Sequence, residues 1–487
     1  MSHKKFIKDI GIFGITQIAG TISGFITLPI ITKLLGVKSY GIWSQMSVTI
    51  TLISIVALLG LPYTLIRFLA GENDKRKIQD GIWSIATIVF CCSLIIALLL
   101  IIFADPIAKF FNCEKILIYL LAFIALFDYL SQVFYNAIRA FQKIGVFSSF
   151  FTFQELGETA LIIVFIYSGF GLTGTIAAVL ITRFIICLGT GIYIISKIGL
   201  SIPRFLRIKE YLSFGLPGVP DAISHWIIQS SDRYLIGFFL GTLFVGYYSP
   251  AYVIGFFVIN LLVSPFGFML PAILSKYYDE NKTDEVKTYL RYSLKYFLLF
   301  AIPAVFGLSV LSKQLLSIIT TPEIANNAHL IMPLVAISMI PMGINAIVVQ
   351  IISITKKTKA GAVITIIAAL LNLGLNFILI PKFGIMGAAL TTFIAYAFIC
   401  TATWVYASKF FVFNPDWQTI SKSIAASIVM SLGVYWLHPL GLYRTFFAIA
   451  SGALIYGILM FLLKSFNQQE IQLFISAAKK IPTSIRT

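Results

Sequence analysis

A chain of 487 residues that is 59% apolar and 11% charged, with a mean hydropathy of +0.94, does not have the composition of a soluble domain. A membrane-spanning helix needs about 20 apolar residues, and apolar stretches of that length recur along the whole sequence between short polar segments. The formal charge of +17 would suit a nucleic-acid-binding protein, but membrane proteins also collect Lys and Arg in cytoplasmic loops, so the distribution of this charge decides between the two classes.

The apolar windows predict an all-α integral membrane protein of about fourteen spanning helices. The first window follows a basic start and continues to Pro29 without a small-residue cleavage site, which favours an uncleaved first helix over a signal peptide. An even number of spans puts both termini on the same side of the membrane. In chain order the windows cover residues 10–32, 41–66, 80–104, 116–138, 146–168, 172–195, 211–239, 246–272, 291–312, 325–352, 360–381, 385–407, 419–438 and 444–463.

The basic residues indicate the orientation. With the N-terminus inside the cell, 26 of the 36 Lys and Arg residues fall on the cytoplasmic side and seven on the outer side. The remaining three, Arg183, Arg233 and Lys295, lie inside spans. This asymmetry predicts a multi-pass protein of the cytoplasmic (plasma) membrane with both termini cytoplasmic, and it explains the basic charge without a nucleic-acid partner. The five cysteines are scattered, so no disulfide or metal framework is expected.

Three segments return later in the chain at nearly equal offsets. Leu35–Ser44 matches Leu240–Ser249 at an offset of 205 residues, Gly169–Leu180 matches Lys382–Phe393 at 213, and a shorter match has an offset of 216. Two copies of a six-helix unit have the same orientation because six is even, so the repeat is parallel. The sequence therefore predicts an N-lobe of helices 1–6 (1–200), a C-lobe of helices 7–12 (201–410), two further helices (411–464) and a cytoplasmic amphipathic tail (465–487).

The seventh predicted helix carries a polar stripe. Its members are spaced i, i+4, i+8 and i+11, which places them on one narrow face. Ionisable groups in a membrane span are functional candidates because each costs about 3 kcal/mol to insert. The stripe is expected either to line a cavity, with the first two residues binding a proton or another cation, or to make interhelical hydrogen bonds. The residues are Asp221, His225, Gln229 and Asp232, with Arg233 beside them.

The first lobe has polar residues at similar depth. Helix 4 carries Asp128 and Arg139 on one face, and this face either lines the cavity or leaves the arginine at the membrane surface. Glu155 and Glu158 lie one turn apart on helix 5, and Arg183 lies on helix 6. These three form a structural ion pair within the lobe, or the arginine binds a phosphate while a glutamate binds a coupling cation.

Other residues and motifs narrow the chemistry. Arg67 at the inner end of helix 2 either contacts an anionic head group or anchors the helix. The chain has no ATP-binding lysine loop, no HExxH, no CxxC pair and no dinucleotide fingerprint. We therefore expect secondary transport with no cofactor and no metal, coupled to H⁺ or Na⁺ or driven by the cargo gradient. A membrane glycosyltransferase or polymerase would need a large catalytic loop, so we expect no enzyme.

Three stretches resemble the multidrug, oligosaccharidyl-lipid and polysaccharide (MOP) exporter superfamily, and specifically its Wzx-type polysaccharide-biosynthesis flippases. They are Ile31–Ser44, Ser231–Gly255 and Asn372–Thr392. The resemblance implies a V-shaped pair of six-helix lobes around a central cavity that opens alternately to each side. It also implies that Asp232 and Arg233 belong to the family signature.

The cargo implied by the resemblance is an undecaprenyl- or dolichyl-diphosphate glycan. Arg67, Arg139 and Arg183 match by position the basic residues that would bind its diphosphate. The lipid II branch of the superfamily carries arginines in its first helix, and residues 10–32 here contain none. The multidrug branch usually stops at twelve helices, so the last two helices favour a glycolipid cargo.

The sequence thus predicts a flippase for a lipid-linked oligosaccharide in surface polysaccharide or glycan biosynthesis. Its expected partners are that glycolipid, the membrane lipids and the polymerase or glycosyltransferases of the same process. The alternative is a cation-coupled multidrug antiporter with the same fold, which would show drug-dependent proton or sodium flux. Alternating access by rocking of one lobe is expected for both.

Overall fold

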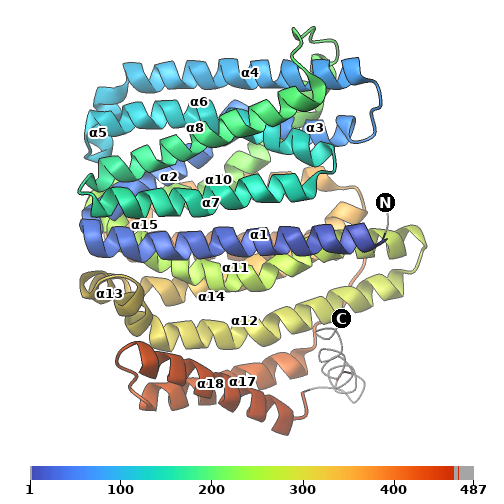
Figure 1. Ribbon diagram of the computed structural model, residues 1–487. Coiled ribbons are helices and arrows are strands. Elements are labelled where there is room, and N and C mark those ends of the chain that lie inside the picture. Colours follow the sequence, from blue (N-terminus) through green and yellow to red (C-terminus); the bar gives the residue numbers. More distant parts are fainter. Residues whose placement is uncertain (1–2, 466–469, 471–487) are drawn as a thin grey trace. The chain divides into compact units, whose positions relative to one another are not determined.

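The structure is a computed structural model that describes residues 3–465 and residue 470. All regular elements in this part of the chain are helices, and Figure 1 shows them coloured along the chain. The predicted amphipathic tail lies outside the described residues apart from Ser465 and Glu470. The helices are α1 (His3–Ile30), η1 (Ile31–Leu35), α2 (Gly36–Leu58), α3 (Leu61–Leu69), α4 (Lys75–Ile102), α5 (Ala104–Phe111), α6 (Lys115–Ala140), α7 (Ile144–Tyr167), α8 (Gly171–Ile198), α9 (Ile208–Gly215), η2 (Leu216–Gly218), α10 (Val219–Leu240), α11 (Thr242–Asp279), α12 (Thr283–Ile319), α13 (Pro322–Ala328), α14 (Ile331–Ile354), α15 (Thr358–Phe383), α16 (Ile385–Ala407), α17 (Trp417–Trp436) and α18 (Leu442–Leu462).

Every predicted window coincides with helical residues, but three windows are broken into separate helices. The window 41–66 is interrupted at Leu59 and Gly60, the window 211–239 at Leu216–Gly218, and the window 325–352 between α13 and α14. The short helix α5 was not predicted, because all of its eight residues except Ala104 fall between two apolar windows. Continuous apolar composition therefore identified the segments and missed the breaks within them.

The first two interruptions pack against each other. Gly60 has a φ of 70°, a left-handed conformation that favours glycine, and α3 then begins at Leu61 with Pro62 in its first turn. A Cβ atom on Gly60 would overlap the carbonyl oxygen of Gly215, and one on Gly215 would lie 2.8 Å from that of Leu59. The backbone approach leaves no room for a side chain, which explains why glycine stands on both sides of the contact.

The protein is a multi-pass membrane protein. Among the described residues, eleven helical stretches are long and apolar enough to cross a membrane. One of them, Ala19–Leu58, continues for 40 residues through α1, η1 and α2. Within this stretch Ile31–Leu35 form a π-helix, a geometry that is rare and is often found at functional positions.

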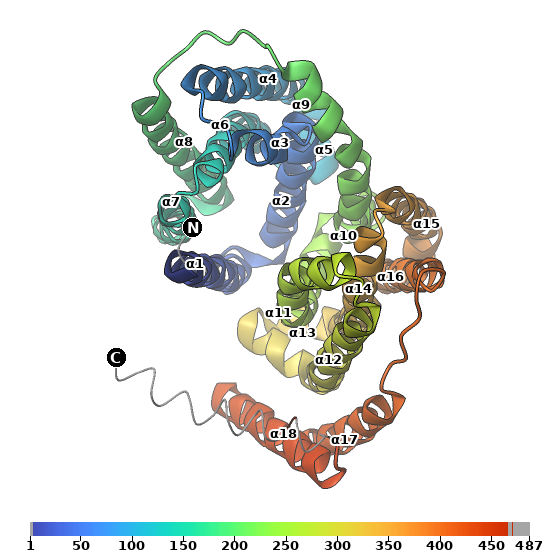
Figure 2. The ribbon, with the colours of Figure 1, turned by 90° about the vertical axis from the view of Figure 1, so that its right-hand side faces the viewer.

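The chain divides into two compact units, which are described separately. The first consists of Met1–Pro250, Ile319–Thr321 and Thr365–Ala388, and the second of the remaining segments. In the first unit α6 is central, because it packs against α2, α3, α4, α7 and α8, while α7 also packs against α1. Figure 2 shows these helices end-on. Ile118, Ile124 and Tyr129 of α6 are completely buried in this core.

The repeated sequences meet inside the first unit. A Cβ atom on Gly41 would overlap the carbonyl oxygen of Thr242, and one on Gly246 would overlap that of Val37. The hydroxyl of Ser44 donates a 2.7 Å hydrogen bond to the hydroxyl of Ser249. Gly41 corresponds to Gly246 in the repeat, and Ser44 corresponds to Ser249. The N-terminal parts of α2 and α11 therefore contact each other through equivalent residues, and small residues allow the close approach.

In the second unit α17 and α18 pack on α12. Leu299, Ala426 and Met460 form one buried cluster, one residue from each helix, and Leu311, Val434 and Ala448 form another. The hydroxyl of Tyr456 donates a 2.7 Å hydrogen bond to the carbonyl of Leu299. This hydrogen bond holds α18 against α12. Such bonds matter in a membrane, because apolar packing alone gives little driving force for helix association in lipid.

We predict that Gly41→Ala lowers the thermal stability of the purified protein, because the new methyl group would overlap the Thr242 carbonyl. Overpacking of this kind costs about 1 to 3 kcal/mol. The matched control is Gly24→Ala, since no atom lies within 4 Å of a Cβ atom there. Thermal unfolding in detergent should separate the two variants, and equal midpoints would contradict the proposed close contact.

Candidate functional site

Arg183 on α8 is the centre of an ion-pair network in the first unit. Its Nε atom lies 3.3 Å from Oδ1 of Asp128 on α6, and its Nη2 atom lies 3.0 Å from Oε2 of Glu158 on α7. The side chains of Arg183 and Glu158 are 17% and 18% exposed, and that of Asp128 is 8% exposed. One guanidinium thus connects three helices, because its planar fork can bind two carboxylates at once.

A hydrogen-bonded layer surrounds this network. The hydroxyl of Tyr135 donates to Oε1 of Gln154 at 3.0 Å, and the amide of Gln154 donates to Oε1 of Glu155 at 3.3 Å. A Cβ atom on Gly20 would lie 3.5 Å from Cγ of Glu155, so α1 closes over this carboxylate. The hydroxyl of Ser23 also donates to the carbonyl of Glu155 at 2.8 Å. The predicted ion pair within the first lobe therefore extends to four helices.

The network has more acidic than basic groups. Asp128, Glu155 and Glu158 would carry three negative charges when ionised, and Arg183 is the basic side chain that the structure brings to them. A charge without a partner is expensive in a region of low dielectric constant. The arrangement can therefore hold a proton or another cation in addition to the arginine.

The other predicted basic residues of the first unit lie apart from this network. Arg139 donates to Oδ1 of Asn136 at 3.3 Å, and its guanidinium carbon lies 5.6 Å from the ring centre of Phe147. Asn136 itself donates to the carbonyl of Gln132 at 2.8 Å, so the side chains of Asn136 and Arg139 both make hydrogen bonds within α6. Arg67 lies in the last turn of α3 and is exposed.

The two ends of the predicted stripe on α10 differ in their exposure. His225 is exposed and Asp221 is half-buried, whereas Asp232 and Arg233 are only 1% and 5% exposed. The Nη1 atom of Arg233 lies 2.7 Å from Oδ1 of Asp232, and the hydroxyl of Tyr248 donates to the other carboxylate oxygen. The buried pair is thus held by side chains of the first unit, while the accessible end offers an acid and an imidazole.

Helix α2 packs directly against the buried end of this stripe. The amide of Gln45 donates to the carbonyl of Arg233 at 3.3 Å, and Gly237 leaves the space that the same amide occupies. The indole of Trp226 donates to the carbonyl of Val48 at 3.0 Å. These bonds fix the rotation of α10, and thereby decide which of its polar residues are covered.

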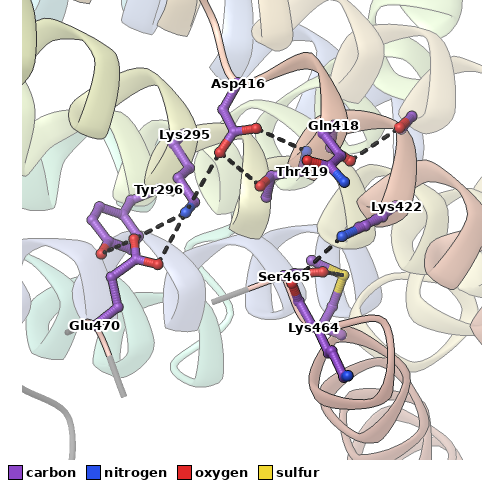
Figure 3. A network of polar contacts seen from close by, with 11 residues as sticks. Lys295, Tyr296, Asp416, Gln418, Thr419, Lys422, Lys464, Ser465 and Glu470 are labelled. Carbon is purple, nitrogen blue, oxygen red and sulfur yellow. Dashed lines mark hydrogen bonds and ion pairs between the residues drawn. The ribbon is translucent and has the colours of Figure 1, made fainter. Parts of the chain in front are cut away.

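Lys295 on α12 is the third basic residue that the sequence placed inside a span. Its ammonium group lies 2.9 Å from Oε1 of Glu470 and 3.6 Å from Oδ2 of Asp416 (Figure 3). The hydroxyl of Tyr296 donates to Glu470 at 2.9 Å. Asp416 also caps α17, because its carboxylate accepts from the backbone amide and the hydroxyl of Thr419.

The sequence did not identify Asp416 and Glu470 as partners of Lys295. The two acids lie 121 and 175 residues further along the chain, in a connecting segment and beyond α18, and neither belongs to a polar stripe. A capping signal at Asp416, three residues before Thr419 and directly before an apolar window, would have predicted the start of α17. No local signal links it to Lys295.

The pKa of Asp416 is lowered although its partial burial acts in the opposite direction. The bonds from Thr419 and the positive charges of Lys295 and Arg291 favour the ionised carboxylate. This carboxylate therefore contributes stability above its ordinary pKa, and that contribution is lost as the pH falls through the lowered value.

Two family models match this chain. The model described as polysaccharide biosynthesis protein matches residues 30–326, and the model of the lipid II flippase MurJ matches residues 236–460. The probable low-salt glycan biosynthesis flippase Agl15 of Haloferax volcanii is 25% identical over 268 residues, 54% of this chain and 56% of that protein. The match thus spans a little over half the length of Agl15. The uncharacterized membrane protein MJ1068 of Methanocaldococcus jannaschii is 23% identical over 410 residues, 78% of each chain.

Solved structures share the fold. The inward closed conformation of the lipid II flippase MurJ superposes with a TM-score of 0.76 at 17% identity, over 93% of this chain and 98% of the other. An inward-facing multidrug resistance MATE family transporter of the MOP superfamily gives a TM-score of 0.61 at 16% identity, over 81% and 94%. At 17% and 16% identity, both similarities show a shared fold.

We predict that Arg183→Gln destabilises the protein by about 3 kcal/mol or more, because two buried carboxylates lose their partner. The triple variant Arg183→Gln, Asp128→Asn, Glu158→Gln should recover most of this loss, since no charge then remains unpaired. Thermal unfolding in detergent gives the comparison. If the triple variant is as unstable as the single one, the arginine stabilises the unit through packing and not through charge.

We predict that Asp416→Ala destabilises α17 more than Asp416→Asn does. The asparagine variant keeps a capping side chain and loses the ion pair, whereas the alanine variant loses both, and a lost cap costs about 1 kcal/mol. Hydrogen exchange of the first turn of α17 measures the difference. The first turn of α17 should be better protected from exchange in the wild type than in Asp416→Asn, and this difference should disappear when the pH falls below the pKa of Asp416. A difference that does not depend on pH would disprove the charge contribution.

Proposed function

Because the chain belongs to the polysaccharide biosynthesis protein family, we propose that it is a flippase that moves a lipid-linked oligosaccharide, a polyprenyl-diphosphate glycan, across the cytoplasmic membrane. The match of the family model over residues 30–326 carries this proposal. It is supported by the relative named as a glycan biosynthesis flippase and by the MurJ-like fold. The protein acts as a transporter and not as an enzyme in this proposal.

The proposed topology has fourteen spans. Ala19–Leu58 counts as two spans when the chain turns at the π-helix, and α10 and α17, with 22 and 20 residues, are long enough to cross a bilayer. Added to the other stretches, these give two six-helix lobes (1–200 and 201–410) followed by two helices. Both termini are cytoplasmic in this arrangement, and the lobes alternate in opening a central cavity.

The cargo would cross with its glycan and diphosphate inside the protein and its polyprenyl tail in the lipid, which avoids moving charge through hydrocarbon. We assign Arg183 to the diphosphate, with Arg67 and Arg139 nearer the cytoplasmic end. Arg183 has carboxylate partners, so a phosphate that binds it must compete with Asp128 and Glu158. The displaced carboxylates would then take up H⁺ or Na⁺, which couples cargo to cation.

On α10 the accessible and the buried residues have different proposed roles. Asp221 and His225 face the passage and contact the cargo or the coupling cation. Asp232 and Arg233 keep the helix in its orientation, because both are buried and hydrogen-bonded. We expect glycosyltransferases or a polymerase to supply or consume the glycan, and we expect no nucleic-acid partner.

The test is flipping of a fluorescent lipid-linked oligosaccharide in liposomes. Asp221→Ala and Arg183→Gln should reduce the rate at least tenfold, the loss expected when a charge-assisted hydrogen bond of about 1.5 to 3 kcal/mol is removed. The stable triple variant with Asp128→Asn and Glu158→Gln should remain inactive, because transport needs the charges themselves. Wild-type rates in the triple variant and in Asp221→Ala would remove these residues from the mechanism.

A control distinguishes the multidrug antiporter, which remains the second candidate because of its shared fold. Proteoliposomes loaded with a pH-sensitive dye should show no drug-dependent proton flux. Water-soluble maleimide should label the new thiol of a His225→Cys variant and leave that of a Ser231→Cys variant unlabelled, since Ser231 is buried. Drug-driven flux without glycolipid flipping would favour the antiporter.

A further inference from the structure

The short helix α5 separates two cavities of the first unit. Residues spaced i, i+3, i+4 and i+7 from Asp105 line a polar cavity, and a second set with the same spacing from Phe103 lines an apolar groove. The two sets lie on opposite faces of α5 and its flanking residues, because each residue advances by 100°. The polar set is Asp105, Ala108, Lys109 and Asn112, and the apolar set is Phe103, Pro106, Ile107 and Phe110.

The polar cavity has a volume of 790 Å³ and an excess of positive charge. Lys38, Lys109 and Lys115 line it, against Asp105 and Glu114. Lys115 is paired with Asp105 at 2.5 Å, and no carboxylate among the described residues pairs with Lys38 or Lys109. These two ammonium groups are therefore available to an anion.

Two helix ends add to this positive potential. The first residues of α6 and α8, both long helices, line the same cavity, and neither helix end has a side-chain cap hydrogen bond. The free backbone N–H groups of a helix N-terminus carry a partial positive charge that favours phosphate. The cavity thus combines two lysines and two helix ends on one side of α5.

The apolar groove on the other side has a volume of 550 Å³ and a lining that suits a hydrocarbon chain. Side chains of α2, α4, α5 and α10 line it, and nearly all of them are aliphatic or aromatic. Its polar lining groups, Thr49 and Tyr234, satisfy each other through a 2.6 Å hydrogen bond. The groove therefore offers an apolar surface without an unsatisfied polar group.

The position of α5 fits a membrane surface. It connects α4 to α6, and both of these helices are long and apolar enough to span the bilayer. An amphipathic helix between two spans lies at the boundary between lipid and water. The hydroxyl of Thr242 donates to the carbonyl of Phe111 at 3.0 Å, so the end of α5 is fixed to the first unit.

We propose that α5 holds a membrane lipid with an anionic phosphate head group, with the phosphate in the polar cavity on Lys38 and Lys109 and one chain in the apolar groove. An ordinary interfacial anchor would need the apolar face alone. The basic cavity on the opposite face adds recognition of the head group, and neither cavity belongs to the ion-pair network of Arg183. The inference therefore does not depend on the transported cargo.

Native mass spectrometry of the purified full chain tests this site with phosphatidylglycerol as the probe. The double variant Lys38→Gln, Lys109→Gln should bind it roughly thirtyfold more weakly, about fivefold for each lysine near an anionic lipid. Leu99→Trp, at an exposed groove position, should also weaken binding because the indole fills the groove. Lys313→Gln and Val405→Trp, exposed positions outside both cavities, should bind as the wild type does.

Two further probes separate the sources of the phosphate. Phosphatidylcholine, which has the same chains and no net charge, should bind weakly, and inorganic phosphate should not displace phosphatidylglycerol. Equal binding of the two lipids, or unchanged binding in the double lysine variant, would reduce α5 to a simple anchor and overturn the proposal. Displacement by inorganic phosphate would also overturn it, because the groove would then contribute nothing.

Discussion

Charge inside an apolar protein has to be compensated, and this constraint organises both units. Arg183, Arg233 and Lys295 are the three basic residues within predicted spans, and each has a carboxylate partner. Because an unpaired charge in this environment costs several kcal/mol, each partnership fixes the helices that provide it. Arg183 connects α6, α7 and α8, and Lys295 connects α12 to the start of α17.

The three partnerships differ in their numbers of acidic and basic groups. In the Asp232–Arg233 pair the guanidinium lies beside one carboxylate oxygen, and the hydroxyl of Tyr248 donates to the other. The Lys295 network shares one ammonium between two acids, Asp416 and Glu470. The Arg183 network lies among long spans and includes Glu155 in its hydrogen-bonded layer. Three carboxylates against one guanidinium leave an excess of acid in this network, and such an excess can accept a cation.

Close backbone contacts form the second constraint, because lipid provides little hydrophobic driving force between helices. Gly41 and Gly246 bring α2 and α11 together, and Gly60 and Gly215 join two helix breaks. Such contacts depend on the absence of a side chain and so tolerate little substitution. Rigid packing of this kind gives a scaffold on which the polar residues keep their positions.

The sequence by itself determined the class, the segments and the family. Length and hydropathy identified the windows of the eleven stretches among the described residues that are long and apolar enough to span a membrane, since the bilayer thickness sets a length that composition reveals. The repeat predicted equivalent glycines and serines, and the resemblance from three short stretches is confirmed by the family model over residues 30–326. The α10 stripe was also visible from its helical spacing.

Only the tertiary structure decided which polar residues have partners and which remain accessible. The rotation of α10, fixed by Gln45, covers Asp232 and leaves His225 exposed, and no periodicity in α10 reports that rotation. The helix breaks at Gly60 and Gly215 depend on each other across 155 residues, so an apolar window could not reveal them. Local sequence determines which helices form in a membrane, whereas the pairing of distant charges and backbones is a property of the packed chain.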